Sequence, residues 1–278
     1  MNFRRLRFGL LTVLGIARRG YFIPYRYAHH LPKAGDNALY TALVDVFSRK
    51  QSQFCEILAC IDFYGSDLIA IGSEPPPAPR WRQDWFPRLD AAVLYVLIRH
   101  NRPKRIIEVG SGHSTRFVAR AIADGGVDCA VTAIDPAPRA SIRGLSVKFL
   151  EATVQQAGME PFLELESGDF LIIDSSHILM PGSDVDIMLN HVLPALPSGV
   201  WVHFHDVFLP NDYPDEWSWR NYNEQSAVAQ LVFNGYDVIF SSQYVVTSML
   251  SEVGASVISR LLVVAGAHES SLWLRKRA

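Results

Sequence analysis

Residues 105–112 read Arg-Ile-Ile-Glu-Val-Gly-Ser-Gly, a short apolar run that ends in an acid and a Gly-x-Gly turn. The apolar run predicts a buried strand. Gly110 and Gly112 at its carboxyl end would let the backbone pass close to a ligand, because glycine has no Cβ. Residues 113–122 then carry apolar side chains at helical spacing, with Ser and Thr available as N-caps. Strand, turn and helix in this order are typical of a cofactor pocket.

The turn does not have the dinucleotide-binding pattern. A Gly-x-Gly-x-x-Gly sequence would require glycine at position 115, where this chain has Thr115, and it would not call for Glu108 inside the strand end. A nicotinamide-dependent oxidoreductase is therefore disfavoured.

The composition is that of an ordinary globular protein. At 278 residues and 49% hydrophobic, the chain is long enough for one large α/β domain with an additional segment. Its net charge of -2 gives no reason to expect nucleic acid as a partner. Three cysteines, Cys55, Cys60 and Cys129, fit neither a disulfide framework nor a CxxC metal pair. They predict a reducing compartment, and we expect the cytoplasm.

Residues 1–20 carry five arginines around a short apolar stretch. A secretory signal peptide would need a small-residue cleavage site after that stretch, but Arg18 and Arg19 follow Ala17, and the stretch is too short to span a bilayer. A basic amphipathic helix could lie on an anionic membrane surface, or it could dock on the domain or on a second subunit. Docking is the simpler interpretation.

A proline-rich stretch at 73–79, Ser-Glu-Pro-Pro-Pro-Ala-Pro, marks a predicted boundary. Because such a run cannot be helical, it should be an extended connector. The sequence thus predicts an N-terminal helical extension over residues 1–80 and a catalytic domain over 81–278.

Within the second segment, apolar runs alternate with helical patterns. The predicted strands are 105–109, 130–134, 147–150, 170–174, 200–205, 237–240 and 271–274, and the predicted helices are 89–100, 114–123, 154–165, 184–193 and 224–234. This alternation predicts an α/β fold, with a doubly wound, mostly parallel seven-stranded sheet and helices on both faces. The last strand lacks the rhythm and is expected to return antiparallel at an edge.

Polar residues follow the predicted strands at the edge where such sheets bind ligands. Asp135 follows the second strand, Asp174 the fourth, and His205 and Asp206 end the fifth. Asp174 and Asp206 are separated by one helix-sized crossover, so their strands would be neighbours about 4.8 Å apart. Two such acids favour Mg²⁺ or Mn²⁺, which bind oxygen ligands and an occasional imidazole.

With these residues in view, the chain resembles the class I S-adenosylmethionine-dependent methyltransferases from about residue 81 to the end. The resemblance rests on Glu108-Val-Gly-Ser-Gly112, Asp135 and Asp174, and it extends to a bacterial branch similar to metal-dependent O-methyltransferases. It implies S-adenosylmethionine as cofactor, with Glu108, Gly110, Ser111, Gly112 and Asp135 binding it. It also implies Mg²⁺ or Mn²⁺ at Asp174, His205 and Asp206. Ser114 departs from members with a third glycine, and His205 replaces a carboxylate or amide.

His177 lies three residues after Asp174 and is the candidate general base, because a neutral imidazole can take the acceptor's proton near neutral pH. The aromatic residues Tyr213, Trp217 and Trp219 of the following loop are candidate walls for a small-molecule or saccharide acceptor.

Two rival functions remain open. One is a metal-dependent hydrolase that uses His203, His205 and Asp206, although their spacing is poor for that chemistry. The other is a non-catalytic cofactor-binding scaffold. A small-molecule O-methyltransferase is the leading hypothesis.

Overall fold

The computed structural model describes residues 3–32 and 39–278. The chain divides into two compact units, Met1–Asn37 and Ala38–Ala278. The first unit contains α1 (Phe3–Val13) and a 3₁₀ turn, η1 (Ala28–His30). Among the described residues, no helix combines the length and the apolar character that crossing a membrane would require.

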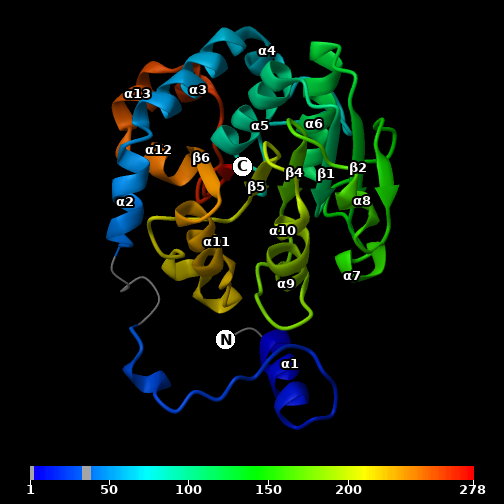
Figure 1. The fold of residues 1–278 in the computed structure, drawn as a ribbon, viewed down its shortest axis with the longest axis vertical. Coiled ribbons are helices and arrows are strands. Elements are labelled where there is room, and N and C mark those ends of the chain that lie inside the picture. The colour runs from blue at the N-terminus through cyan, green and yellow to red at the C-terminus, as the bar shows by residue number, and fades with distance from the viewer. Residues whose placement is uncertain (1–2, 33–38) are drawn as a thin grey trace. The chain divides into compact units, whose positions relative to one another are not determined.

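The second unit is built on a seven-stranded sheet in the order β3-β2-β1-β4-β5-β7-β6, surrounded by helices (Figure 1). All neighbouring strands are parallel except β7, which runs antiparallel to both β5 and β6. The predicted fold class is therefore confirmed, including an antiparallel last strand, although β7 lies inside the sheet and β6 is its edge. The strands are β1 (Arg105–Val109), β2 (Ala130–Ile134), β3 (Lys148–Leu150), β4 (Phe170–Ile173), β5 (Trp201–Phe204), β6 (Tyr236–Ser241) and β7 (Leu272–Lys276).

Short and long helices connect these strands. They are α2 (Thr41–Ser48), α3 (Gln51–Phe63), α4 (Gly65–Ala70), α5 (Arg88–Asn101), α6 (His113–Gly125), α7 (Val154–Ala157), α8 (Glu160–Leu163), α9 (Asp184–Ile187), α10 (Leu193–Ala195), α11 (Glu224–Phe233), α12 (Ser242–Ser248) and α13 (Leu250–Ala255), with a π-helical segment η2 (Met188–Val192) and 3₁₀ turns η3 (Asp215–Arg220) and η4 (Val257–Arg260).

The helix predicted over 154–165 is two short helices, α7 and α8. Gly158 between them has φ +73° and ψ −165°, a non-helical backbone conformation that glycine adopts readily and that ends α7. Pro161 in the first turn of α8 has no N–H to continue the hydrogen-bond ladder of the preceding turn. These two residues explain the break.

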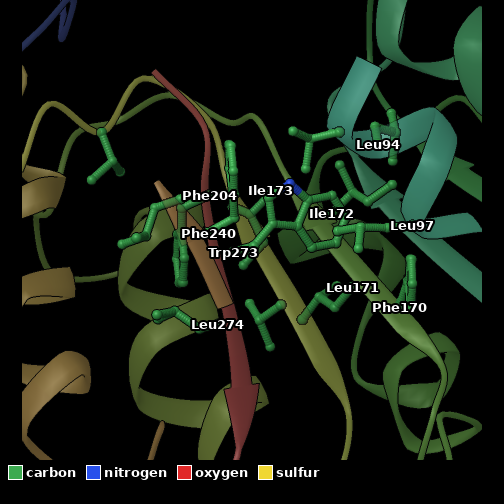
Figure 2. Packing of buried hydrophobic residues seen from close by; sticks show 14 of the residues in the cluster. Leu94, Leu97, Phe170, Leu171, Ile172, Ile173, Phe204, Phe240, Trp273 and Leu274 are labelled. Carbon is green, nitrogen blue, oxygen red and sulfur yellow. The ribbon is translucent and has the colours of Figure 1, made fainter. Parts of the chain in front are cut away.

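The core of the second unit lies along the central strands. All four residues of β4 are buried, and Figure 2 shows them between Leu94 and Leu97 of α5 and the side chains of the neighbouring strands. Helices α2 and α3 add Leu43, Phe47 and Phe54 to the same core. This packing holds the carboxyl ends of β1, β4 and β5 in fixed register, where the candidate site residues lie. The predicted division after residue 80 stays a prediction.

Candidate active site

The glycine turn after β1 is locked against the end of β4. Gly110 has φ +81°, and a Cβ there would lie 1.8 Å from the carbonyl oxygen of Asp174. Its N–H also donates to the carbonyl of Ile134 at the end of β2, with 3.0 Å between nitrogen and oxygen. Only glycine fits this position, because a side chain would push apart two adjacent strand ends.

Asp135 is held by the same turn. Its Oδ2 accepts hydrogen bonds from the N–H and the hydroxyl of Ser111, at 2.7 and 3.1 Å, and its Oδ1 accepts one from the N–H of Ala137 at 2.7 Å. The carboxylate is therefore oriented in advance, and its remaining lone pairs are available to hydroxyl groups of a ligand.

A pocket of about 420 Å³ opens beside this turn. Three of the predicted cofactor residues, Gly110, Ser111 and Asp135, line it together with Asp174. Gly112 and Glu108 are not among its lining residues. The other lining residues are Val109, Ile134, Pro136, Ala137, Arg139, Ala152, Thr153, Val154, Gln155, Ser175, Ser176 and Asp184.

Glu108 lies fully buried beneath the turn. Its Oε2 accepts a hydrogen bond from the hydroxyl of Thr115 at 2.6 Å, and the same hydroxyl oxygen accepts one from the N–H of Gly112 at 2.9 Å. Its Oε1 is buried and finds no hydrogen-bond partner among residues 3–32 and 39–278. Burial raises the pKa of Glu108 to about 7, although hydrogen bonds from Ser114 and Thr115 partly oppose this. Glu108 therefore lies behind the turn and does not line the pocket.

The ends of β4 and β5 bring two acids and a histidine together. Nε2 of His177 lies 3.3 Å from Oδ1 of Asp174 and 3.4 Å from Oδ2 of Asp206. One ligand atom from each residue lies within 4.8 Å of the others, which makes this a group that could hold a metal ion. The two acids are thus neighbours as the sequence predicted, because β4 and β5 pair in parallel.

His177 is fixed by the start of α11. Its Nδ1 lies 2.8 Å from Oε2 of Glu224, and its carbonyl oxygen accepts hydrogen bonds from the N–H groups of Asn223 and Glu224 at 3.1 and 3.3 Å. His177 and Asp206 also have positive φ, 59° and 55°, which non-glycine residues rarely adopt. Such backbone conformations persist only where the surrounding structure enforces them, and they are common at functional sites.

His205, the predicted third ligand, also lies beside both acids. Its Nδ1 is 3.3 Å from Oδ1 of Asp206 and 3.7 Å from Oδ1 of Asp174, and its Nε2 is 3.4 Å from Oδ2 of the buried Asp90. Two histidines therefore face the same acidic pair. The metal role of His205 stays a prediction.

His203 does not face the acids Asp174 and Asp206, because its side chain is hydrogen-bonded elsewhere. It is fully buried, its Nε2 lies 2.8 Å from the hydroxyl of Ser271, and burial lowers its pKa to about 3. It is therefore a neutral core histidine. The group of possible metal ligands found in the described part of the chain is Asp174, His177 and Asp206, and it includes neither His203 nor His205. A hydrolase centre of His203, His205 and Asp206 therefore has no geometric support.

The protonation states of the histidines and acids in this cluster depend on one another. Burial lowers the pKa of His177, but hydrogen bonds to Asp174 and Glu224 outweigh it and hold that pKa well above its usual value. Burial likewise raises the pKa of Asp174, but His205 and His177 outweigh it and hold that pKa well below its usual value. Imidazolium and carboxylate therefore neutralise each other, and a divalent cation could replace that positive charge.

The three predicted acceptor residues are spread over one aromatic cluster. The rings of Tyr213 and Trp217 lie 5.9 and 6.0 Å from that of Tyr222, which in turn lies 4.5 Å from the His177 ring. Trp219 is 57% exposed and contacts this group through Arg220. Tyr213 and Trp217 are thus connected to the cluster at β4, whereas Trp219 lies at the surface.

Sequence reasoning missed Tyr222 and Glu224. A glutamate in the first turn of a helix is common, because it complements the helix dipole, so Glu224 carried no distinctive signal. Only its burial, at 1% exposure, and its contact with His177 mark it as part of the site.

Residues 107–207 match a family model described as a methyltransferase domain. This stretch runs from the glycine turn to Asp206 and so includes the pocket and the acidic cluster. Over this stretch the chain is similar to methyltransferase domains. No curated protein matches the chain significantly.

Several solved structures are similar at low identity. A Podospora anserina methyltransferase bound to S-adenosylhomocysteine is 15% identical with a TM-score of 0.44, over 93% of this chain and 100% of that one. The protein cmcI, solved with Mg and S-adenosylmethionine, is 18% identical with a TM-score of 0.42, over 75% and 89%. An O-methyltransferase from Bacillus cereus in complex with S-adenosylhomocysteine is 14% identical with a TM-score of 0.39, over 85% and 96%.

Proposed function

We propose that this methyltransferase transfers the methyl group of S-adenosylmethionine to a hydroxyl of a small molecule or saccharide, with a divalent cation held by Asp174 and Asp206. One observation carries the proposal: Asp174 is both a wall of the cofactor pocket and a member of the acidic cluster. A methyl donor in that pocket and an acceptor at that cluster would be next to each other.

The cofactor side of the proposal rests on Glu108, Gly110, Ser111, Gly112 and Asp135. Asp135 would accept the ribose hydroxyls, because Ser111 and Ala137 already orient its carboxylate toward the pocket. Glu108 would accept the cofactor's ammonium at its unpaired Oε1 only if the turn shifted to open the pocket onto it, since Glu108 is buried and does not line the pocket. Gly110 keeps the turn close to β4, and Gly112 starts α6 behind it.

The cation side rests on oxygen and imidazole donors of the kind that Mg²⁺ and Mn²⁺ accept. Asp174 and Asp206 would be two ligands. Both His177, with Nε2 3.3 and 3.4 Å from the acids, and His205, with Nδ1 3.7 and 3.3 Å from them, reach the same position, and we assign His205 as the third ligand and keep His177 for the proton. When bound, the cation would supply positive charge that lowers the pKa of the acceptor hydroxyl.

His177 would accept the proton of that hydroxyl. Against the effect of burial, the acids around His177 raise its pKa and favour the imidazolium, so the ring would be neutral only when a cation bound to the acids replaces that positive charge. Because Glu224 holds Nδ1, the lone pair of the neutral ring would then lie on Nε2, which faces the cluster. The carboxylate of Glu224 would then stabilise the imidazolium that forms, as the acid does in a histidine–carboxylate pair. Methyl transfer from sulfonium is an in-line displacement, so alignment of donor and acceptor supplies much of the rate.

The acceptor would lie against Tyr213, Trp217 and Tyr222, with Trp219 at the outer rim. Aromatic faces beside a polar centre suit a flat ring or a sugar face. We also keep the cytoplasm as the proposed location, since Cys55, Cys60 and Cys129 are all free thiols.

The direct test combines binding with turnover. Calorimetry should detect S-adenosylhomocysteine binding. Radiolabelled S-adenosylmethionine, offered with a panel of catechols, phenols, saccharides and amines, should label the hydroxyl acceptors, with label lost in EDTA. Undiminished labelling in EDTA would show that methyl transfer does not require a divalent cation. Transfer only to amine acceptors would remove the hydroxyl.

A further inference from the structure

The helix α1 presents a continuous apolar surface that is exposed. Phe3, Leu6 and Leu10 recur every three or four residues and share one side of α1, and Leu14 follows at the same spacing in the turn just after its end. No residue of α1 is buried, and these four side chains are 41% to 79% exposed. Such a row of large apolar groups in water marks a surface that binds something.

The charge around this surface has a single sign. Residues 1–35 contain seven Lys or Arg and no Asp or Glu, although the whole chain has a net charge of -2. Beyond the helix, Tyr21, Phe22, Tyr25 and Tyr27 are exposed too. Basic groups flanked by apolar and aromatic side chains are the composition of segments that lie in the headgroup region of a bilayer.

Arg7 distinguishes a lipid surface from a protein surface. It lines a groove of about 290 Å³ together with five apolar residues, namely Phe3, Leu6, Leu10, Leu11 and Leu14. A protein that covered this groove would have to bury the guanidinium against an acid, at a large desolvation cost. At a bilayer the long side chain can reach lipid phosphates while its neighbours enter the acyl boundary.

We propose that α1 binds the methyltransferase to anionic membrane surfaces, with Phe3, Leu6, Leu10 and Leu14 in the acyl boundary and its arginines at the lipid phosphates. The helix lies on the membrane surface without crossing it. The arginines attract the lipid phosphates, and the apolar side chains enter the acyl boundary. Binding therefore requires anionic lipid and weakens with salt.

The experiment uses the full chain and two kinds of vesicle. Co-sedimentation is measured with equal parts phosphatidylglycerol and phosphatidylcholine, and with phosphatidylcholine alone. The parent should bind the first and not the second. The triple variant R4Q/R5Q/R7Q should bind the anionic vesicles on the order of 100-fold more weakly, since each arginine near the surface contributes about 1 kcal/mol.

The matched control is R49Q/R82Q/R260Q, which removes the same charge from three exposed arginines of the second unit. It should bind like the parent. L6E/L10E tests the apolar side and should abolish sedimentation while S-adenosylhomocysteine binding stays unchanged. Equal loss in the two arginine variants, or no binding by the parent, would overturn the proposal. A dimer that L6E/L10E dissociates, with no vesicle binding, would assign the surface to a second copy instead.

Discussion

His177 and Glu224, 47 residues apart in sequence, form a buried imidazole–carboxylate pair. Nδ1 of His177 lies 2.8 Å from Oε2 of Glu224, and the two side chains are 2% and 1% exposed. The pair links the loop after β4 to the start of α11, and it directs Nε2 of the ring at Asp174 and Asp206. The orientation of the imidazole is therefore set by a residue outside the acidic cluster.

Glu224→Gln should lower kcat about 10- to 100-fold without changing the affinity for S-adenosylhomocysteine, because such orienting partners typically contribute that much. The measurement is steady-state kinetics on an acceptor identified by labelling. Glu252→Gln, an exposed glutamate on α13, is the control. Normal turnover in Glu224→Gln would mean that the pair only stabilises the fold.

The His177→Gln variant tests whether His177 acts as the general base or as a ligand of the cation. If His177 is the base, the His177→Gln variant should keep the Mn²⁺ affinity of the parent. Its kcat should fall strongly, and the fall of kcat at low pH that protonation of the base causes should disappear. Mn²⁺ binding followed by electron paramagnetic resonance gives the second readout. A drop in Mn²⁺ affinity of tenfold or more would instead assign Nε2 to the cation.

Asp206→Asn should weaken Mn²⁺ binding by at least tenfold, because it removes one of two carboxylates that face a shared position. Asp215→Asn, at an exposed position of η3, removes the same charge and should leave the affinity unchanged. If both variants bind Mn²⁺ like the parent, the cation lies elsewhere or is not bound.

Asp135→Asn should weaken S-adenosylhomocysteine binding about tenfold, since a neutral amide is a poorer acceptor for ribose hydroxyls. Calorimetry of the variant is compared with Asp128→Asn, an exposed acid just before β2. Equal affinities in a folded Asp135→Asn protein would contradict the ribose assignment.

Glu108→Gln should change how stability depends on pH. The folded protein raises the pKa of Glu108 from 4.5 to about 7, so it holds this proton more tightly than the unfolded chain does. The contribution of Glu108 to the free energy of unfolding is therefore fully present below about pH 4.5, and it is lost as the pH rises through about 7. Glutamine cannot ionise, so the variant should gain up to about 3 kcal/mol over the parent between pH 4 and pH 8. Urea unfolding of parent and variant at pH 4 and at pH 8 measures this gain. If the difference in free energy of unfolding between the two proteins is the same at both pH values, the pKa of Glu108 is not raised in the folded protein.

Much of this protein is determined by local sequence. The apolar run 105–109 followed by Gly110 and Gly112 predicts strand and turn, because buried parallel strands need continuous apolar residues and a left-handed turn needs glycine. The same reasoning places Asp174 and Asp206 at adjacent strand ends, as the β4–β5 pairing confirms. Short-range chemistry sufficed for these features.

Tertiary structure alone decided which side chains meet across the sheet. Gly110 is required by the carbonyl of Asp174, 64 residues away, and no local pattern contains that clash. His177 receives its partner from α11, whereas His203 is turned to Ser271, the residue just before β7. Strand periodicity says which face a histidine occupies, but its hydrogen-bond partner comes from whichever distant element packs there. The sequence therefore determined the strands and the residues at their ends, and the packing of α11 and β7 decided their roles.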